Sequence, residues 1–349
     1  IYNCTLFIYI VDLTQSPNSQ SSSLCDTCFF SLYSHKNSQK MANLTLVTGF
    51  LLMGFSKSWE LQVLHAILFL LIYLMSLMGN LVIFTLISLD EHLHSPMYFF
   101  LKNLSFLDLC FISTTLPKSI TNSLSNSRSI SFIGCVLQLF FVILFGASEL
   151  FLLTVMSYDR YVAICQPLHY EVIMTRGLCV KMAAVPWFIG ILFGTMYSAS
   201  TFTLPFCNSK EIHQFFCDVP SLLRLSCSGV HIGVDVTLAM GVAYGILCCI
   251  SITISYGPIF STVLKIPTPE GRSKAFSTCI PHLTVLMVFI TTILIDYLKP
   301  PQESDSVIDL LLSMFYAVVP PTLNPVIYSL RNKDMKTSLR KLIARKHIS

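Results

Sequence analysis

The sequence predicts an all-α membrane protein: a bundle of seven transmembrane helices followed by a short amphipathic C-terminal helix. Composition is the first reason, because 54% of the 349 residues are hydrophobic and only 11% are charged, whereas soluble domains are nearer a quarter charged. The second reason is that seven apolar runs reach bilayer length. The third is an excess of basic residues on one side of those runs. A net charge of +4 is too small to indicate a nucleic-acid partner.

Residues 1–40 differ from the rest of the chain. They are rich in Ser, Asn, Gln and Thr, and they begin with Ile. Their apolar patch, Leu6–Val11, is too short to span a membrane and has no basic flank before it, so it does not fit a signal peptide. We expect 1–40 to be a disordered segment or upstream sequence from a gene model, and 41–349 to form the membrane domain.

A glycosylation site is predicted just after Met41. Asn43 opens an Asn-Leu-Thr sequon in a segment expected outside the cell. Asn103 opens a second match, but it lies at the inner end of a span, so we interpret that match as chance.

Seven spans follow, each near or above bilayer length and too long for a core strand. They cover approximately 61–87, 96–120, 134–160, 181–203, 234–264, 274–297 and 306–330. After the last span, the basic stretch 332–346 has Met335, Leu339 and Leu342 at helical spacing. This pattern predicts an amphipathic helix on the inner leaflet, attracted by anionic lipid.

Lys and Arg in the connections indicate the orientation. The side holding thirteen of them is predicted to be internal: Arg160, Arg176, Lys181, Lys265, Arg272, Lys274, Arg331, Lys333, Lys336, Arg340, Lys341, Arg345 and Lys346. The other side holds six: Lys57, Lys118, Arg128, Lys210, Arg224 and Lys299. The bias predicts an external N-terminus and a cytoplasmic C-terminus, as an odd number of spans requires.

Three charged residues lie within or at the ends of apolar runs. Asp108 is in the middle of the second span and Glu149 in the third. Acids in a membrane are costly and indicate function, although two protonated acids bonded to neighbouring helices would also explain them. Arg160 lies where the third span ends. Alone, it could be a membrane-edge anchor whose guanidinium reaches the interface.

Five motifs in order make the chain similar to a known family. They are MANLTLVTGFLLMGFS from Met41, LHSPMYFFLKNLSFLDLC at 93–110, MSYDRYVAIC at 156–165, KAFSTCIPHL at 274–283 and PPTLNPVIYSLRN at 320–332. The chain resembles the olfactory receptors, the odorant branch of rhodopsin-like G-protein-coupled receptors, from about Met41 to Lys341. It departs from the family pattern at Ser157 (usually Ala), Pro281 (usually Ser) and Ile290 (often Tyr).

The resemblance implies roles at the inner end of the bundle. Residues matching those that couple the receptor to its G protein or change during activation are Asp159, Arg160, Tyr161, Tyr256, Asn324, Pro325 and Tyr328. Pro325 also removes a backbone donor and frees a carbonyl, so a kink is expected unless polar neighbours compensate.

The resemblance also implies a structural sodium ion, and otherwise no cofactor or metal is expected. Its predicted ligands are Asp108, Glu149 and Asn324, with Asn80 completing the polar core.

The implied ligand is a small, mostly apolar volatile bound in the outer half of the bundle. The predicted pocket consists of Val142, Ile143, Gly146, Ala147, Met240, Tyr244, Ile293, Leu294, Tyr297 and Met314. Amine receptors of the wider superfamily carry an Asp where this chain has Val142, so a protonated amine would find no partner in that place. Asp296 is an alternative partner, although it lies near the outer edge of its span. The implied response is activation of a stimulatory heterotrimeric G protein, which raises cAMP.

The loop between the fourth and fifth spans contains Cys207, Cys217 and Cys227, ten residues apart, and Cys135 begins the third span on the same side. Spacing leaves the pairing open, and a metal site with His213 is an alternative. The resemblance implies a Cys135–Cys217 disulfide, and Cys207 would then pair with Cys227.

Two other classes of membrane protein are less consistent with the sequence. A transporter or channel is disfavoured because the halves show no repeat and no matching broken helices. An enzyme is disfavoured because HExxH, G-x-S-x-G and a phosphate-binding glycine loop do not occur.

Overall fold

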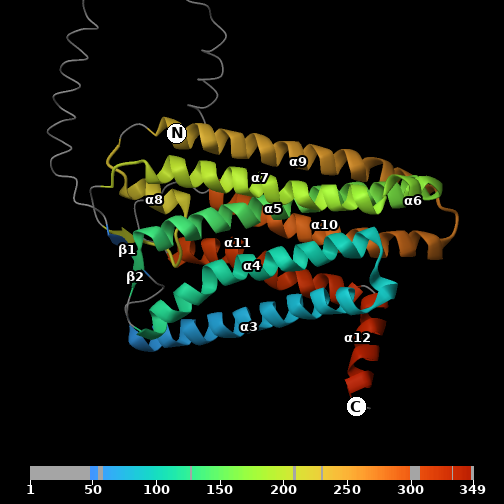
Figure 1. The fold of residues 1–349 in the computed structure, drawn as a ribbon, viewed down its shortest axis with the longest axis horizontal. Coiled ribbons are helices and arrows are strands. Elements are labelled where there is room, and N and C mark those ends of the chain that lie inside the picture. Colours follow the sequence, from blue (N-terminus) through green and yellow to red (C-terminus); the bar gives the residue numbers. More distant parts are fainter. Residues whose placement is uncertain are drawn as a thin grey trace, which may run out of the picture. The chain divides into compact units, whose positions relative to one another are not determined.

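The computed structural model describes residues 48–53, 58–125, 128–206, 210–228, 231–298, 307–331 and 333–346. Its long helices are α3 (Trp59–Leu89), α4 (Pro96–Ser125), α5 (Phe132–Cys165), α7 (Arg176–Phe202), α9 (Ile232–Lys265), α10 (Pro269–Leu298) and α11 (Val307–Arg331). They lie roughly side by side (Figure 1). The seven predicted spans are therefore confirmed as helices. The prediction for 1–40 falls outside the described residues, as does Asn43.

Shorter elements close the two ends of the bundle. The strands are β1 (Gly49–Leu52), β2 (Ser129–Ser131) and β3 (Glu211–Ile212), and the short helices are η1 (Glu91–Leu93), η2 (Pro167–His169), α6 (Tyr170–Ile173), α8 (Val219–Leu225) and α12 (Lys333–Lys346). In Figure 1 the strands and α8 lie at the left end of the bundle and α6 at the right. We call these the strand end and the α6 end.

Helix α5 is the centre of the packing, since it contacts α4, α7, α9 and α10. Buried residues make up 56% of its most apolar stretch, compared with 22% in α3 and 17% in α9. Over the described residues, five helices are long and apolar enough to cross a membrane, and α10 is a sixth if its two halves form one span. These halves, Pro269–Ser277 and His282–Thr291, are bent by 43°. The bend includes the position of Pro281, whose missing N–H removes a helical hydrogen bond.

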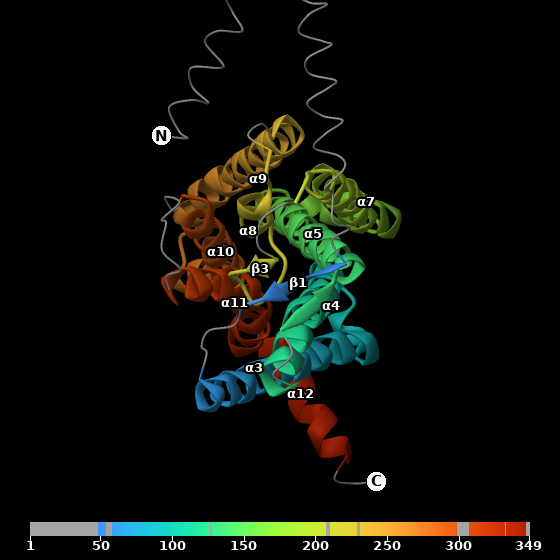
Figure 2. The same cartoon turned by 90° about the vertical axis from the view of Figure 1, so that its left-hand side faces the viewer.

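A small sheet, ordered β2-β1-β3, lies across the strand end (Figure 2). Strand β1 pairs antiparallel with β2 and parallel with β3. Gly49 is required in β1, because a Cβ there would collide with the carbonyl oxygen of Ile130. Phe50, Ile212 and Leu222 are buried in an apolar cluster beneath this sheet. The sheet was not predicted, since a strand of four residues has too little pattern to recognise.

Helix α12 confirms the predicted amphipathic pattern where its side chains are described. Met335 is buried and Leu339 packs against the main core, while the phenol of Tyr98 donates to Asp334 Oδ2 at 3.1 Å. A hydrogen bond from Ser338 lowers the pKa of Asp90, which lies just after α3. These bonds dock the start of α12 against the α6 end of α3 and α4.

Candidate functional site

The buried pair Asp159 and Arg160 lies at the α6 end of α5. Arg160 Nη2 donates to Asp159 Oδ2, and both side chains are nearly inaccessible to solvent, with 1% and 9% exposed. An anchor that reaches the membrane interface would instead leave its guanidinium exposed. The burial of Arg160 therefore does not fit the simple anchor.

Tyr170, in α6, holds the other oxygen of Asp159. Its phenol donates to Asp159 Oδ1 at 2.7 Å. Burial, followed by the charge of Asp159, raises the pKa of Tyr170, so the hydroxyl keeps the proton that it donates. The sequence analysis missed Tyr170, because only the fold brings α6 back to Asp159.

A buried histidine joins three helices near this pair. The hydroxyl of Tyr256 in α9 lies 2.7 Å from His282 Nδ1 in α10, and His282 Nε2 lies 2.9 Å from the carbonyl oxygen of Leu153 in α5. His282 belongs to the KAFSTCIPHL motif, but no role was predicted for it. Tyr328 in α11 is half-buried, and its buried hydroxyl has no hydrogen-bond partner within the described residues.

Of the remaining residues predicted for coupling, Tyr161 is half-buried and its ring lies 6.4 Å from that of Tyr158. Pro325 is buried in α11. The predicted coupling residues thus come from three different helices, α5, α9 and α11.

The predicted sodium ligands form one cluster in the bundle. Asn324 Nδ2 lies 3.2 and 3.0 Å from the two carboxylate oxygens of Asp108 and 3.1 Å from Glu149 Oε1. Both acids are fully buried, at 0% and 1% exposure. The carboxylate oxygens suit a hard cation, whereas Asn324 presents its amide nitrogen, a hydrogen-bond donor, to both acids. Within the described residues, however, no group of three or more His, Cys, Asp or Glu gathers to hold a metal ion.

Asn80 makes no side-chain hydrogen bond to Asp108, Glu149 or Asn324 among the described residues, and its place in the polar core stays a prediction. Its Nδ2 donates to the carbonyl oxygen of Pro321 at 2.9 Å, and Ser76 Oγ donates to the same oxygen at 2.9 Å. Pro325 explains this choice, because its missing N–H would otherwise bond that carbonyl. Helices α3 and α11 also pack closely at this point, since a Cβ on Gly79 would lie 2.8 Å from Pro325 Cβ.

The predicted ligand residues on α5 and α9 lie together. Val142 is buried and Ile143 half-buried, and a Cβ on Gly146 would meet no atom within 4 Å. The hydroxyl of Tyr244 donates to the carbonyl oxygen of Ala147 at 2.7 Å. This bond uses the hydroxyl proton of Tyr244, which is therefore not available to a ligand in this arrangement.

Other predicted pocket residues are less well defined. Met240 is 38% exposed, and Met314 packs half-buried against the main core. Ile293, Leu294 and Tyr297 lie in α10, but their side chains are outside the described set.

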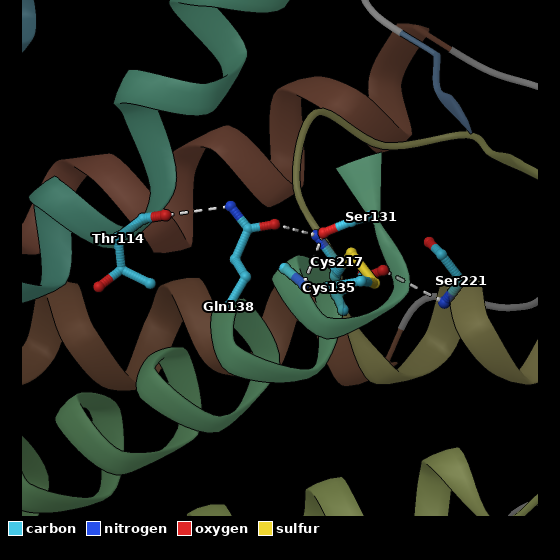
Figure 3. Close-up of a disulfide and its surroundings, with 8 residues drawn as sticks. Thr114, Ser131, Cys135, Gln138, Cys217 and Ser221 are labelled. Carbon is cyan, nitrogen blue, oxygen red and sulfur yellow. Dashed lines mark hydrogen bonds between the residues drawn. A yellow bond between two sulfur atoms is a disulfide. The ribbon is translucent and has the colours of Figure 1, made fainter. Parts of the chain in front are cut away.

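The predicted disulfide between Cys135 and Cys217 is confirmed (Figure 3). Beside it, Gln138 Oε1 accepts the backbone N–H of Cys217 at 2.9 Å, and Gln138 Nε2 donates to the carbonyl oxygen of Thr114 at 3.0 Å. Gln138 thus ties the loop, α5 and α4 together. An amide in an apolar run one turn after a cysteine was a signal for this role.

The disulfide removes Cys217 from the alternative metal site with His213. Cys227 is also disulfide-bonded, but its predicted partner Cys207 lies outside the described residues. After Cys217, Asp218 caps α8 by accepting the backbone N–H of Ser221 at 3.3 Å. Burial raises the pKa of Asp218 to about 6, although the bonds from Ser221 oppose the rise.

Comparisons with known proteins agree with this geometry. A family model described as olfactory receptor matches residues 69–346. Human olfactory receptor 14A2 is 61% identical over 303 residues, covering 87% of this chain and 96% of the relative. Human olfactory receptor 14A16 is 56% identical, covering 87% and 98%.

Squid rhodopsin, known from a crystal structure, matches with a TM-score of 0.61 over 81% of each chain, at 15% identity. At that identity the match bears on the fold alone, and it supports the seven-helix bundle. The family model and the two human relatives extend this from fold to family. The chain belongs to the olfactory receptor family of G-protein-coupled receptors.

Proposed function

We propose that this chain is an odorant receptor of the plasma membrane that binds a small, mostly apolar volatile and activates a stimulatory heterotrimeric G protein, raising cAMP. Family membership supports a small-molecule ligand and a G-protein partner. The observation that carries the proposal is the arrangement of α5. That helix holds open space beside Gly146 towards the strand end and the buried Arg160–Asp159 pair at the α6 end.

The ligand class follows from the side chains around the open space. Val142, Ile143 and Ala147 offer no charge, so a protonated amine would be bound without a counter-ion. Ala147 has its carbonyl oxygen already bonded to Tyr244. A volatile of ~12 heavy atoms gaining roughly 0.5 kcal/mol per atom would bind by about 6 kcal/mol, a Kd of tens of micromolar.

A screen of volatiles on cells that express the receptor and a cAMP reporter tests the ligand class. Gly146→Phe should fill the space and abolish responses to the active odorant. The matched control is Ile246→Phe, which adds a ring at a position that is 54% exposed on α9, and it should respond normally. A submicromolar response to a charged amine that survives Gly146→Phe would refute this pocket.

Activation is proposed to be a shift between two arrangements of the helices. In the resting arrangement Asp159 holds Arg160, and Tyr256 is held by His282. A ligand that prefers the other arrangement would release Arg160 towards the G protein. The hydroxyl of Tyr328, which has no partner among the described residues, is then available for a new bond.

The coupling role is tested with Arg160→Ala, which we expect to reach the cell surface and to give no odorant-evoked cAMP. Arg176→Ala is the matched control, because it removes an exposed arginine from the start of α7 on the same side of the bundle. It should signal normally. A full response from Arg160→Ala at equal surface expression would contradict the role.

A sodium ion is proposed to sit with Asp108, Glu149 and Asn324 in the resting arrangement. A bound cation would supply positive charge that offsets the repulsion between the two carboxylates. Glu149→Gln should weaken any dependence of basal cAMP on sodium, measured against potassium at constant ionic strength. If the wild type shows no sodium dependence, the acids have only a structural role.

The N-terminus is proposed to be external and the C-terminus cytoplasmic. The strand end, with its disulfide, would then face the oxidising side of the membrane. An epitope tag at the C-terminus should be labelled by antibody only after permeabilisation. Asn43→Gln should remove an enzymatically cleavable glycan. If antibody labels the C-terminal tag on intact cells, the C-terminus is external and the proposed orientation is wrong.

A further inference from the structure

A hollow opens at the strand end between α3 and α4, away from the odorant pocket proposed beside Gly146. Its enclosed volume is about 20 Å³, room for one water-sized group. Leu52 of β1 and Phe215 of the loop before α8 supply its apolar lining. Its polar lining is Gln62, His65, Ser119, Asn122, Ser123 and Arg128.

Arg128 gives the hollow a positive charge. It lies just before β2, and its backbone carbonyl accepts the N–H of Leu52 at 2.7 Å, which fixes the main chain there. Its Nη1 lies 3.9 Å from the thioether sulfur of Met53, a weak acceptor with no charge. Across the described residues Arg128 makes no ion pair. No Asp or Glu is among the residues that line the hollow.

Asn122 adds a second donor. It lies on α4 with 7% of its surface exposed, and its Nδ2 has no hydrogen-bond partner among the described residues. An unpaired buried donor destabilises the folded protein, so an acceptor placed in the hollow would offset that cost. The hydroxyls of Ser119 and Ser123 can turn to donate towards the same acceptor.

We propose that this hollow binds a monovalent anion, either chloride or the carboxylate group of a small organic acid. A guanidinium, an amide N–H and hydroxyls are the donors that such an anion needs. A cation would be repelled by Arg128, and an apolar molecule would leave the donor of Asn122 unpaired. The bound anion would tie α4 to the segment that carries β2, and so would hold the sheet over the strand end.

Thermal unfolding of the purified full-length receptor in lipid nanodiscs tests the proposal. Chloride and acetate are each titrated as sodium salts against methanesulfonate at constant ionic strength. At least one of the two anions should raise the unfolding midpoint in a saturable way. In Arg128→Gln the concentration that gives half of the shift should rise by roughly tenfold, since charge-assisted hydrogen bonds are the strong ones.

Two further variants make the outcome decisive. Asn122→Ala removes the unpaired donor without changing the charge, and it should weaken the anion effect even if Arg128→Gln fails to fold. Arg224→Gln removes an exposed arginine of α8 that does not line the hollow, and it should respond like the wild type.

Saturation by chloride alone would identify an inorganic ion, and saturation by acetate a carboxylate. If neither anion shifts the midpoint, or if Arg128→Gln and Asn122→Ala respond like the wild type, the proposal is wrong.

Discussion

Each carboxylate oxygen of Asp159 accepts one hydrogen bond. Arg160 donates to one oxygen, and Tyr170, which lies outside α5, donates to the other. Tyr170→Phe removes that phenolic donor and keeps the ring. A lost bond of about 1–1.5 kcal/mol would raise the active fraction, and therefore basal cAMP, roughly five- to tenfold. The measurement is ligand-independent cAMP at matched surface expression.

The control for this prediction is Tyr158→Phe. It removes a hydroxyl from a tyrosine that is 40% exposed on the same end of α5, and it should leave basal cAMP unchanged. Equal basal cAMP in the wild type and Tyr170→Phe would show that Arg160 alone holds Asp159.

Single residues were predictable where their neighbours in sequence fix their surroundings. Asp108 and Glu149 stood out because acids are rare in apolar runs. Their shared donor, Asn324, was predicted only through the family resemblance. Asn80 and Tyr244 donate to backbone carbonyl oxygens. Every residue has such a carbonyl, so the sequence alone does not show which one is the partner.

Among the elements, α5 and α7 approach so closely that one glycine is essential to their contact. A Cβ on Gly190 would collide with the carbonyl oxygen of Leu144 and with Ser148 Oγ, which itself donates to Pro186. Gly190→Ala should therefore destabilise the receptor by roughly 1–3 kcal/mol. The measurement is the thermal unfolding midpoint of purified protein.

Gly177→Ala is the matched control in the same helix. A Cβ there meets nothing within 4 Å, so the substitution should be neutral or stabilise by up to about 1 kcal/mol through helix propensity. If Gly190→Ala unfolds at the same temperature as Gly177→Ala, the contact between α5 and α7 can relax.

The long helices were predictable to within a few residues, because an apolar run of bilayer length rarely forms anything other than a transmembrane helix. The strands were not, because β1 is stable only through pairing with segments far along the chain. Helix α8 was missed for a related reason. Its seven residues are held by the cap from Asp218 and by burial in the loop, and not by a strong helical pattern.

At the scale of the whole molecule, the Cys135–Cys217 bridge closes a loop with a sequence separation of 82 residues. A bridge of this kind contributes about 2–4 kcal/mol. Cys135→Ser should therefore remain in the endoplasmic reticulum, measured as glycans that stay sensitive to endoglycosidase H. Cys110→Ser, at a half-buried free cysteine, is the control and should reach the surface. Surface expression of Cys135→Ser at the wild-type level would contradict the prediction.

The order of strands in the small sheet also constrains when the receptor can be finished during synthesis. Strand β1 emerges from the ribosome first, but β3 follows about 160 residues later, after α7 has been made. At about 5–20 residues per second, that interval is roughly 8–30 s. Throughout it, one edge of β1 has no partner, and an unpaired edge invites pairing with other chains. We therefore expect the nascent receptor to bind a chaperone at its strand end until the loop after α7, which carries β3, has been made.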